Sequence, residues 1–284
     1  MTKPTVGVVG AGVIGAGVAQ DLAQRGFRPI LVDVSEAALD AARERIRTSV
    51  SAACLFARSK PADPPDEIFA RVSATTRYDA LSGVDFVIEN ATEDVEIKRP
   101  IYEMLDAVCP KDCVLIANTS CIPITRLASF TKWPARVIGI HFMNPVPMMH
   151  TVEMVPGVET SGRTIDKAKG LMEQLGKTCI VVKDSPGFVS NRILMLAINE
   201  AVRVLEEGVA DAESVDGIFK SCFGHPMGPL ETADLIGLDT VLLSLEVLRD
   251  SFDDAKYQPC RLLKEMVAEG RLGRKSGAGF HPYS

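Results

Sequence analysis

The first two thirds of the chain alternate between short apolar runs and longer amphipathic stretches. The short runs, rich in β-branched residues, predict strands, and the stretches between them predict helices. Strands that alternate with helices are typical of an α/β protein with a doubly wound, parallel sheet, and we expect that fold here. The predicted strands are residues 5–9, 30–32, 72–75, 86–89, 114–117, 136–140, 152–155 and 178–182, and the predicted helices are 11–24, 35–58, 95–108, 125–131 and 164–176.

The pattern changes after Pro186. Ser185 as N-cap and Pro186 at the first helical position predict the start of a long apolar helix that continues to Glu207. Further helices are predicted at residues 211–223, 231–251 and 258–270, with no strand pattern between them. We therefore expect two domains: an α/β domain over residues 1–186, in which 35–75 form a helical excursion from the sheet, and an all-helical domain over 187–284.

Composition and charge exclude several classes of partner. The 284 residues carry a formal charge of −6, and no basic run is long enough to hold a nucleic acid backbone. No stretch approaches the ~20 apolar residues of a membrane span, and no targeting segment precedes the first predicted strand. We expect a cytoplasmic protein that binds neither nucleic acid nor a membrane.

The seven cysteines give no pattern of a metal site. Only Cys109 and Cys113 lie close together, and neither a second pair nor a histidine cluster accompanies them. The spacing therefore disfavours both a zinc site and a disulfide framework, and we expect free, buried thiols and no bound metal.

A glycine-rich turn joins the first predicted strand to the first predicted helix. It reads Gly10-Ala11-Gly12-Val13-Ile14-Gly15, the G-x-G-x-x-G pattern. The first glycine permits the tight turn, the second lets the backbone approach a pyrophosphate, and the third lets helix and strand pack closely. The phosphates would lie at the helix N-terminus, where unpaired N–H groups favour an anion. The turn therefore predicts a Rossmann-type dinucleotide-binding domain.

An acidic residue follows at the distance that this kind of unit requires. Asp33 stands at the end of the second predicted strand, 18 residues after Gly15. Its carboxylate would accept hydrogen bonds from the adenosine ribose and would repel a 2′-phosphate. Val34 and Ser35 offer no arginine to compensate, so we expect NAD rather than NADP.

Four polar side chains stand where such a sheet would present them to a cofactor. Ser120 and His141 come soon after predicted strands, and ligands of open α/β sheets lie beyond the carboxyl ends of strands. Glu153 lies inside an apolar strand, where a carboxylate is costly to bury unless it is paired, and a histidine is an apt partner. Asn191 falls in the first helix of the second domain. Together they predict an active site where the two domains meet.

Six motifs, in their order and spacing along nearly the whole chain, resemble the L-3-hydroxyacyl-CoA dehydrogenase family. The length fits best the short bacterial members, the 3-hydroxybutyryl-CoA dehydrogenases. The motifs are the Gly10–Gly15 turn, Glu89-Asn90-Ala91-Thr92-Glu93-Asp94, Asn118-Thr119-Ser120, the segment from His141 to Pro147, the segment from Asp184 to Arg192, and the segment from Gly224 to Pro229.

This resemblance implies roles for individual residues. His141 matches the general base that takes the hydroxyl proton while C3 gives its hydride to nicotinamide, and Glu153 matches the carboxylate that orients the imidazole. Ser120 and Asn191 match donors of hydrogen bonds to the substrate's oxygens. The resemblance also implies NAD as cofactor and a homodimer through the second domain. Family positions that contact the cofactor or the pantetheine side are matched by Glu93, Lys98, Asn144 and Lys275.

Two departures from the family concern the substrate. In its CoA enzymes a serine and a lysine seven residues later contact the CoA nucleotide; Ser49 matches the serine, but Phe56 replaces the lysine. Arg58 cannot simply substitute, because two residues along a helix is about 200° of rotation. His150 replaces a common lysine, and Cys121-Ile122-Pro123 replaces a more usual Ser-Leu.

Similar variants occur among dehydrogenases of polyketide extender-unit assembly, which act on a hydroxyacyl group, such as glyceryl, on an acyl carrier protein. The substrate is therefore a hydroxyacyl thioester of CoA or, alternatively, of such a carrier protein. Docking of an acidic carrier would need a local basic patch, for example around Arg43, Arg47 and Arg58.

Other classes remain as rivals. A nucleotide-binding protein without catalysis would keep the fold, although the complete set of polar candidates speaks against it. Short-chain dehydrogenases need a Tyr-x-x-x-Lys pair, which none of the four tyrosines offers. The β-hydroxyacid dehydrogenases depend on a lysine in the first helix of the second domain, and residues 187–208 contain no lysine.

Overall fold

The computed structural model describes residues 3–56 and 63–283. The chain forms two compact units, Met1–Asp184 and Ser185–Ser284, each packed mainly within itself. Within the described residues, no helix combines the length and the apolar character needed to cross a membrane.

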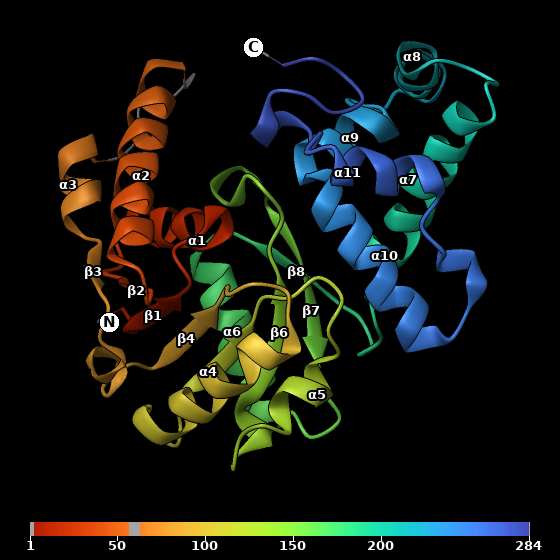
Figure 1. The fold of residues 1–284 in the computed structure, drawn as a ribbon. Helices are drawn as coiled ribbons and strands as arrows, with labels where there is room; N and C mark the ends of the chain where they lie inside the picture. Colours follow the sequence, from red (N-terminus) through yellow and green to blue (C-terminus); the bar gives the residue numbers. More distant parts are fainter. Residues whose placement is uncertain (1–2, 57–62, 284) are drawn as a thin grey trace. The chain divides into compact units, whose positions relative to one another are not determined.

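The first unit is built on one eight-stranded sheet with the order β3-β2-β1-β4-β5-β6-β7-β8 (Figure 1). Neighbouring strands are parallel except β6 and β7, which are antiparallel. The predicted doubly wound sheet is therefore confirmed, but its expected parallel arrangement is wrong at this one pair of strands. Residues 142–150, which join β6 to β7, are too few for the crossover that parallel neighbours require. The strands are β1 (Val6–Val9), β2 (Ile30–Val32), β3 (Ser73–Thr75), β4 (Phe86–Glu89), β5 (Val114–Ala117), β6 (Val137–His141), β7 (Thr151–Pro156) and β8 (Thr178–Val181).

Helices cover both faces of this sheet, as the alternating pattern predicts. Alternate strand residues such as Val8, Ile116 and Ile138 join α1 and α6 in one buried apolar core. Helix α4 lies on the face opposite α6 (Figure 1), and α5 packs on β6. The helices of the first unit are α1 (Val13–Gln24), α2 (Glu36–Phe56), α3 (Pro65–Ala70), α4 (Val95–Val108), α5 (Ile124–Ala128) and α6 (Gly162–Gln174).

A buried lysine fixes the connection between β6 and β7 to helix α1. The Nζ of Lys177 lies 2.9 Å from an Asp21 carboxylate oxygen and donates to the carbonyls of Val146 and Met149 at 2.8 and 2.7 Å. Burial raises the pKa of the Asp21 carboxyl, while the ammonium of Lys177 acts in the opposite direction. This contact ties α1, the helix that the glycine-rich turn begins, to the segment that follows His141.

We expect Lys177→Met to lower the free energy of unfolding by about 3–5 kcal/mol, because it leaves the buried Asp21 without its partner. Burial penalises the charged form of Asp21, whose pKa is raised in the folded state. Its cost to stability therefore grows as the pH rises from the pKa of the unfolded chain toward the raised pKa of the folded state. The loss of unfolding free energy should be smaller at pH 5 than at pH 8. Urea unfolding at both pH values measures it, with the exposed Lys132→Met as control. Equal unfolding free energies for the two variants would contradict the expectation.

Helices are the main elements of the second unit in its described residues, and the C-terminal segment adds isolated β-bridges. Two predicted helix boundaries are wrong. The first helix begins at Ser190 rather than at Pro186, because Gly187 and Phe188 have φ of +73° and +48°, outside the helical region. The predicted helix 231–251 is two helices, separated at Gly237, whose φ is +102°. The helices are α7 (Ser190–Glu206), α8 (Ala212–Phe223), α9 (Pro229–Ile236), α10 (Leu238–Phe252) and α11 (Arg261–Ala268).

Candidate active site

The glycine-rich turn between β1 and α1 has the geometry expected of a pyrophosphate cradle. Gly10 has a φ of +91°, and a Cβ on Gly15 would lie 1.8 Å from the Gly10 carbonyl oxygen, so neither position accepts a side chain without rearrangement. A Cβ on Gly12, in contrast, would meet nothing within 4 Å. Gly12 is also the N-cap of α1, with no side chain capping the helix. The space beside Gly12 is therefore open, and no side chain caps the first N–H groups of α1, so an anionic ligand can approach them.

Asp33 lies beside this turn at the end of β2. Its carboxylate accepts hydrogen bonds from the N–H of Ala11 at 2.7 Å and of Ser35 at 3.0 Å, which fixes its orientation. The side chain lines a cavity of about 630 Å³ together with Gly10, Gly12 and residues of α4. Within the described part of the chain, that lining contains no lysine or arginine. The residues present therefore fit a dinucleotide with a free ribose hydroxyl pair.

His141 and Glu153 form a direct pair. His141 ends β6 and stands opposite Glu153 in the antiparallel register with β7, and directly opposite residues present their side chains on the same face of a sheet. The Nδ1 of His141 lies 2.9 Å from Oε2 of Glu153, and both residues are buried. Because a carboxylate only accepts, Nδ1 carries the proton of the neutral ring, and Nε2 is left as the basic nitrogen.

Ser120 faces that basic nitrogen. Its Oγ lies 3.2 Å from the Nε2 of His141, after the turn that follows β5, the strand next to β6. Three side chains from three neighbouring strand ends therefore form one line, from Ser120 through His141 to Glu153. This arrangement can take a proton at Nε2 and stabilise the resulting positive charge through the carboxylate behind the ring.

Glu93 holds the turn that carries Ser120. Its Oε1 accepts hydrogen bonds from the backbone N–H groups of Ser120, Cys121 and Ile122 at 3.0, 2.8 and 3.3 Å, and from the hydroxyl of Thr119. The resemblance implies a cofactor contact for this residue. The anchoring of the Ser120 turn is a function that sequence reasoning missed, since nothing in the spacing links residue 93 to residue 120.

A pair of asparagines that the sequence analysis assigned to motifs, but to no role, links the strand ends beneath the site. Asn118 accepts a hydrogen bond from the N–H of Phe142 at 3.1 Å and donates to the side chain of Asn90 at 2.8 Å. Asn90 donates in turn to the carbonyl of Ile88 at 3.0 Å. These bonds connect the ends of β4, β5 and β6. Their signal in the sequence is an asparagine directly after each of two predicted strands.

The other predicted site residues lie in different surroundings. Lys98 is fully buried, and its ammonium bonds to both carboxylate oxygens of Glu89 at 2.8 and 2.9 Å, so its contact with cofactor or pantetheine stays a prediction. Asn144 is exposed on the connection from β6 to β7, and Ser49 is half-buried on α2. The remaining two belong to the second unit: Asn191 lies on α7, and Lys275 is paired there with Asp239.

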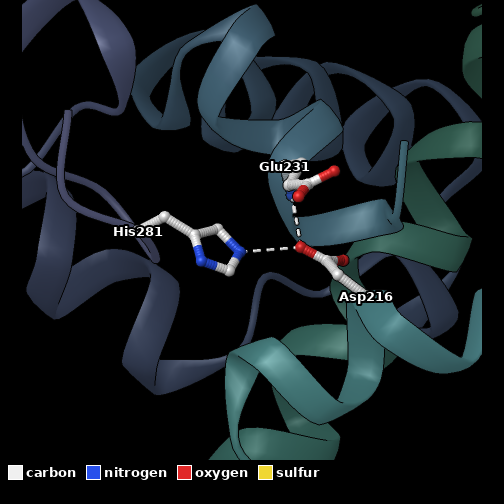
Figure 2. Close-up of side chains that lie close together, drawn as sticks. All are labelled: Asp216, Glu231 and His281. Atoms are coloured by element: carbon white, nitrogen blue, oxygen red, sulfur yellow. Dashed lines mark hydrogen bonds and ion pairs between the residues drawn. The ribbon is translucent and has the colours of Figure 1, made fainter. Parts of the chain in front are cut away.

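A cluster in the second unit has the composition of a metal site but serves as a helix cap. Asp216, Glu231 and His281 place their ligand atoms within 4.8 Å of one another. Figure 2 shows the Asp216 carboxylate between the His281 ring and the Glu231 backbone. It accepts from the N–H groups of Leu230 and Glu231 at the start of α9, both at 2.9 Å, and contacts the His281 Nε2 at 2.7 Å. Glu231 is paired with Lys220. The network therefore anchors α9 and the C-terminal segment.

Comparison with known families covers both units. The model for the NAD binding domain of 3-hydroxyacyl-CoA dehydrogenase matches residues 5–185, and the model for the C-terminal domain of 3-hydroxyacyl-CoA dehydrogenase matches residues 187–283. Together the two models leave almost none of the chain unmatched.

Individual proteins are similar over nearly their whole length. A "probable 3-hydroxybutyryl-CoA dehydrogenase" of Deinococcus radiodurans is 44% identical over 98% of this chain and 99% of its own. Among solved structures, (S)-3-hydroxybutyryl-CoA dehydrogenase of Ralstonia eutropha is 44% identical with a TM-score of 0.89 over the full length of both chains. FadB2 of Mycobacterium tuberculosis is 38% identical, with a TM-score of 0.94 over 98% of each chain.

Proposed function

Since the chain belongs to the 3-hydroxyacyl-CoA dehydrogenase family, we propose that it interconverts 3-hydroxybutyryl-CoA and acetoacetyl-CoA as an NAD-dependent enzyme. The observation that carries this proposal is the line of Ser120, His141 and Glu153, with the basic Nε2 of His141 3.2 Å from the Ser120 hydroxyl. A substrate hydroxyl group placed at this nitrogen would meet Nε2 of His141 as proton acceptor and the Ser120 hydroxyl as hydrogen-bond donor. Oxidation of that hydroxyl to a carbonyl requires a group that accepts its proton.

His141 takes the hydroxyl proton of the substrate on Nε2 in this proposal. The charge that develops on the imidazole is balanced by Glu153 through the 2.9 Å contact at Nδ1. NAD, when bound, supplies the acceptor for the hydride that leaves C3. Ser120 donates a hydrogen bond to the forming carbonyl oxygen, held in place by the bonds from its turn to Glu93. In the reverse direction the protonated His141 returns its proton to that oxygen.

The remaining assignments follow the family motif. We assign Asn191 a second hydrogen bond to the substrate, and Glu93, Lys98, Asn144 and Lys275 contacts to the cofactor or the pantetheine side. The unit that contains β1 to β8 binds NAD at the Gly10–Gly15 turn. We place the functional domain boundary between residues 186 and 187, where the two family matches meet, two residues after the point at which the compact units separate. The helical domain contributes to substrate binding.

Oxidation of NADH by acetoacetyl-CoA tests the proposed function directly. We expect turnover with acetoacetyl-CoA and NADH that falls when the acyl chain is lengthened. The same absorbance assay without enzyme, and with the His141→Ala variant, supplies the background. Absence of turnover on every acyl-CoA offered, in protein that binds NADH, would reject the proposal in favour of a nucleotide-binding protein without catalysis.

Asp33 determines the choice between NAD and NADP in this proposal. We expect Asp33→Asn to lower kcat/KM for NAD by about tenfold to 10²-fold, since one charged hydrogen bond is worth about 1.5–3 kcal/mol, and to raise the relative use of NADP. The asparagine keeps the acceptor for one of the two backbone N–H groups that bind the separate oxygens of Asp33. Asp40→Asn on the exposed side of α2 is the matched control. An unchanged ratio of kcat/KM for NAD to NADP would contradict the assignment.

An acyl carrier protein as the thioester carrier is the second candidate substrate. The basic residues on α2 that would bind the carrier already have partners within the chain. Arg43 is paired with Asp40 at 2.7 Å, and Arg47 lies over the Phe69 ring at 4.7 Å from its centroid. Arg58 and the side chain of Phe56 lie outside the described residues. Initial rates on acetoacetyl-CoA and on acetoacetyl-loaded carrier protein, at equal concentrations, distinguish the two. We expect the CoA thioester to react faster.

We also propose that the protein works in the cytoplasm as a homodimer formed through the helical domain. Large apolar side chains exposed in that unit support the second part: Ile193 on α7 is 64% exposed, and Ile218 and Phe223 on α8 are 51% and 65% exposed. Sedimentation of the full chain measures the oligomeric state. A monomer at micromolar concentration would overturn the proposed homodimer.

A further inference from the structure

A buried ion pair lies beside the loop that joins β4 to α4. Glu89 is the last residue of β4, and Lys98 lies in the first turn of α4. The Nζ of Lys98 is 2.8 Å from Oε1 and 2.9 Å from Oε2 of Glu89. Only 0% of the lysine side chain and 1% of the glutamate side chain are exposed. The proposed reaction does not use this pair, so its presence needs another explanation.

The pair holds both backbone groups of Ala91, which lies in the loop. The N–H of Ala91 donates to Oε1 of Glu89 at 2.6 Å, and the carbonyl of Ala91 accepts from Nζ of Lys98 at 3.1 Å. An ammonium group has three protons to donate. Those of Lys98 have three acceptors within the chain, namely the two carboxylate oxygens of Glu89 and the carbonyl of Ala91. The hydrogen-bonding capacity of this ammonium is therefore used inside the protein.

The held loop packs directly against the glycine-rich turn. A Cβ on Gly10 would lie 2.8 Å from the carbonyl carbon of Asn90 and 3.0 Å from the backbone nitrogen of Ala91. Asn90 and Ala91 also line the cavity of about 630 Å³ that Asp33 borders. The loop is therefore one wall of the cavity in which we expect NAD to bind, and the position of Ala91 determines where that wall lies.

Stability alone is a weak reason for this ion pair. Burial raises the pKa of the Glu89 carboxyl, while the ammonium of Lys98 and the N–H of Ala91 act in the opposite direction. Apolar side chains of similar volume often replace a buried ion pair without loss of stability. Such side chains, however, have no groups that could hold the N–H and carbonyl of Ala91. The contact with the loop is what only the charged pair provides.

We propose that Glu89 and Lys98 are positioning residues of the cofactor site, which hold Ala91 against Gly10 and so preform one wall of the NAD cavity. The inference rests on the proposed binding of NAD at the Gly10–Gly15 turn. It specifies that Lys98 acts through the backbone of Ala91, in place of the direct contact that the family motif implies. A preformed wall spares the ligand the cost of ordering the loop. Loss of the pair should therefore weaken cofactor binding rather than slow the chemical step.

A double-mutant cycle tests this role through the dissociation constant of NADH, measured by fluorescence titration. The variants are Glu89→Met, Lys98→Met and the two together; the double variant leaves no buried charge and should be the most stable of the three. We expect each to raise the dissociation constant about tenfold, with kcat at saturating NADH within about threefold of the unaltered chain. The two changes should not add, because either one releases the same loop.

Hydrogen–deuterium exchange of the chain without cofactor gives a readout that does not depend on NADH. The amide of Ala91 is bonded to Glu89, so it should exchange slowly in the unaltered chain. In Glu89→Met and in the double variant we expect its exchange to be at least about tenfold faster, with the rest of the sheet unchanged. A change confined to this loop distinguishes positioning from a general loss of stability.

An exposed ion pair on the same helix supplies the matched control. Glu96 and Arg99 lie 3.5 Å apart, with 75% and 46% of their side chains exposed. Glu96→Met combined with Arg99→Met should leave the dissociation constant of NADH within about twofold. Urea unfolding shows which variants are folded, and the double variant decides the question if a single variant is not.

Three results would overturn the proposal. Unaltered NADH affinity in the folded double variant would make the pair structural. Unaltered affinity in Glu89→Met together with a loss in Lys98→Met would show that the lysine binds the cofactor directly. Slow exchange of the Ala91 amide in Glu89→Met would show that the pair does not hold the loop. Failure of the unaltered chain to bind NADH would instead reject the proposed function, and the exchange of the Ala91 amide distinguishes these two failures.

Discussion

Replacing His141 with alanine is expected to lower kcat by a factor of about 10²–10⁴ while the affinity for NADH stays within about twofold. The proton acceptor at Nε2 is lost, but the glycine-rich turn and Asp33, where the cofactor is expected to bind, are unchanged. Steady-state kinetics with acetoacetyl-CoA measure kcat, and fluorescence titration measures NADH binding separately.

A second histidine variant controls for nonspecific effects of the change. His225 is exposed and packs beside the Phe219 and Phe223 rings of the helical unit. His225→Ala should keep kcat within about twofold of the unaltered chain. Near-normal turnover in His141→Ala would remove His141 from the chemistry altogether, whatever the control shows.

Replacing Glu153 with glutamine should lower kcat by about tenfold to 10²-fold with little change in KM. The carboxylate contributes one charged hydrogen bond to the imidazole, worth about 1.5–3 kcal/mol, and it contributes most when the ring becomes positive in the transition state. Glutamine keeps the size of the side chain, so the register of β6 and β7 should persist. A loss confined to kcat therefore distinguishes a positioning residue from one that only stabilises the fold.

The matched control for this variant is Glu159→Gln, an exposed glutamate shortly after β7 in the same unit. Circular dichroism and urea unfolding establish that both variants are folded. We also expect the pH profile of kcat to move in Glu153→Gln and not in the control, because only the former alters the charge beside His141. If Glu153→Gln has the wild-type kcat and pH profile, the residue is structural.

Much of the first unit could be predicted from local signals. The glycine-rich turn is recognisable because stereochemistry requires glycine at fixed positions. In the structure Gly10 has a positive φ, and Gly15 lies against a carbonyl oxygen where a side chain has no room. The alternation of strands and helices is confirmed over both sheet faces. Helix ends in the second unit were less predictable, because Gly237 lies inside an otherwise helical pattern and only its backbone conformation ends α9.

The surroundings of charged residues were the least predictable feature. The sequence places Lys98 in a predicted helix and gives no sign that its side chain is buried. In the structure it is fully buried against Glu89. Glu93 and the turn at Ser120 are 27 residues apart in sequence, but one carboxylate oxygen bonds to three successive N–H groups of that turn. Nothing in the sequence links Arg136 to the turn after α4, but its guanidinium donates to the carbonyl of Pro110 and to Asp106. Such contacts depend on which strands become neighbours.

The sequence by itself determined the dinucleotide-binding unit and the preference for NAD, because glycine spacing and an acid at a strand end act within about thirty residues of chain. It also supplied Ser120, His141 and Glu153 as candidates. Only the tertiary structure decided that these three meet. The short connection after β6 reverses the chain, the antiparallel register sets Glu153 opposite His141, and the turn after the neighbouring β5 places the Ser120 hydroxyl at Nε2 of the ring. A hydrogen bond between strands distant in sequence is fixed by register, and register is a property of the assembled sheet.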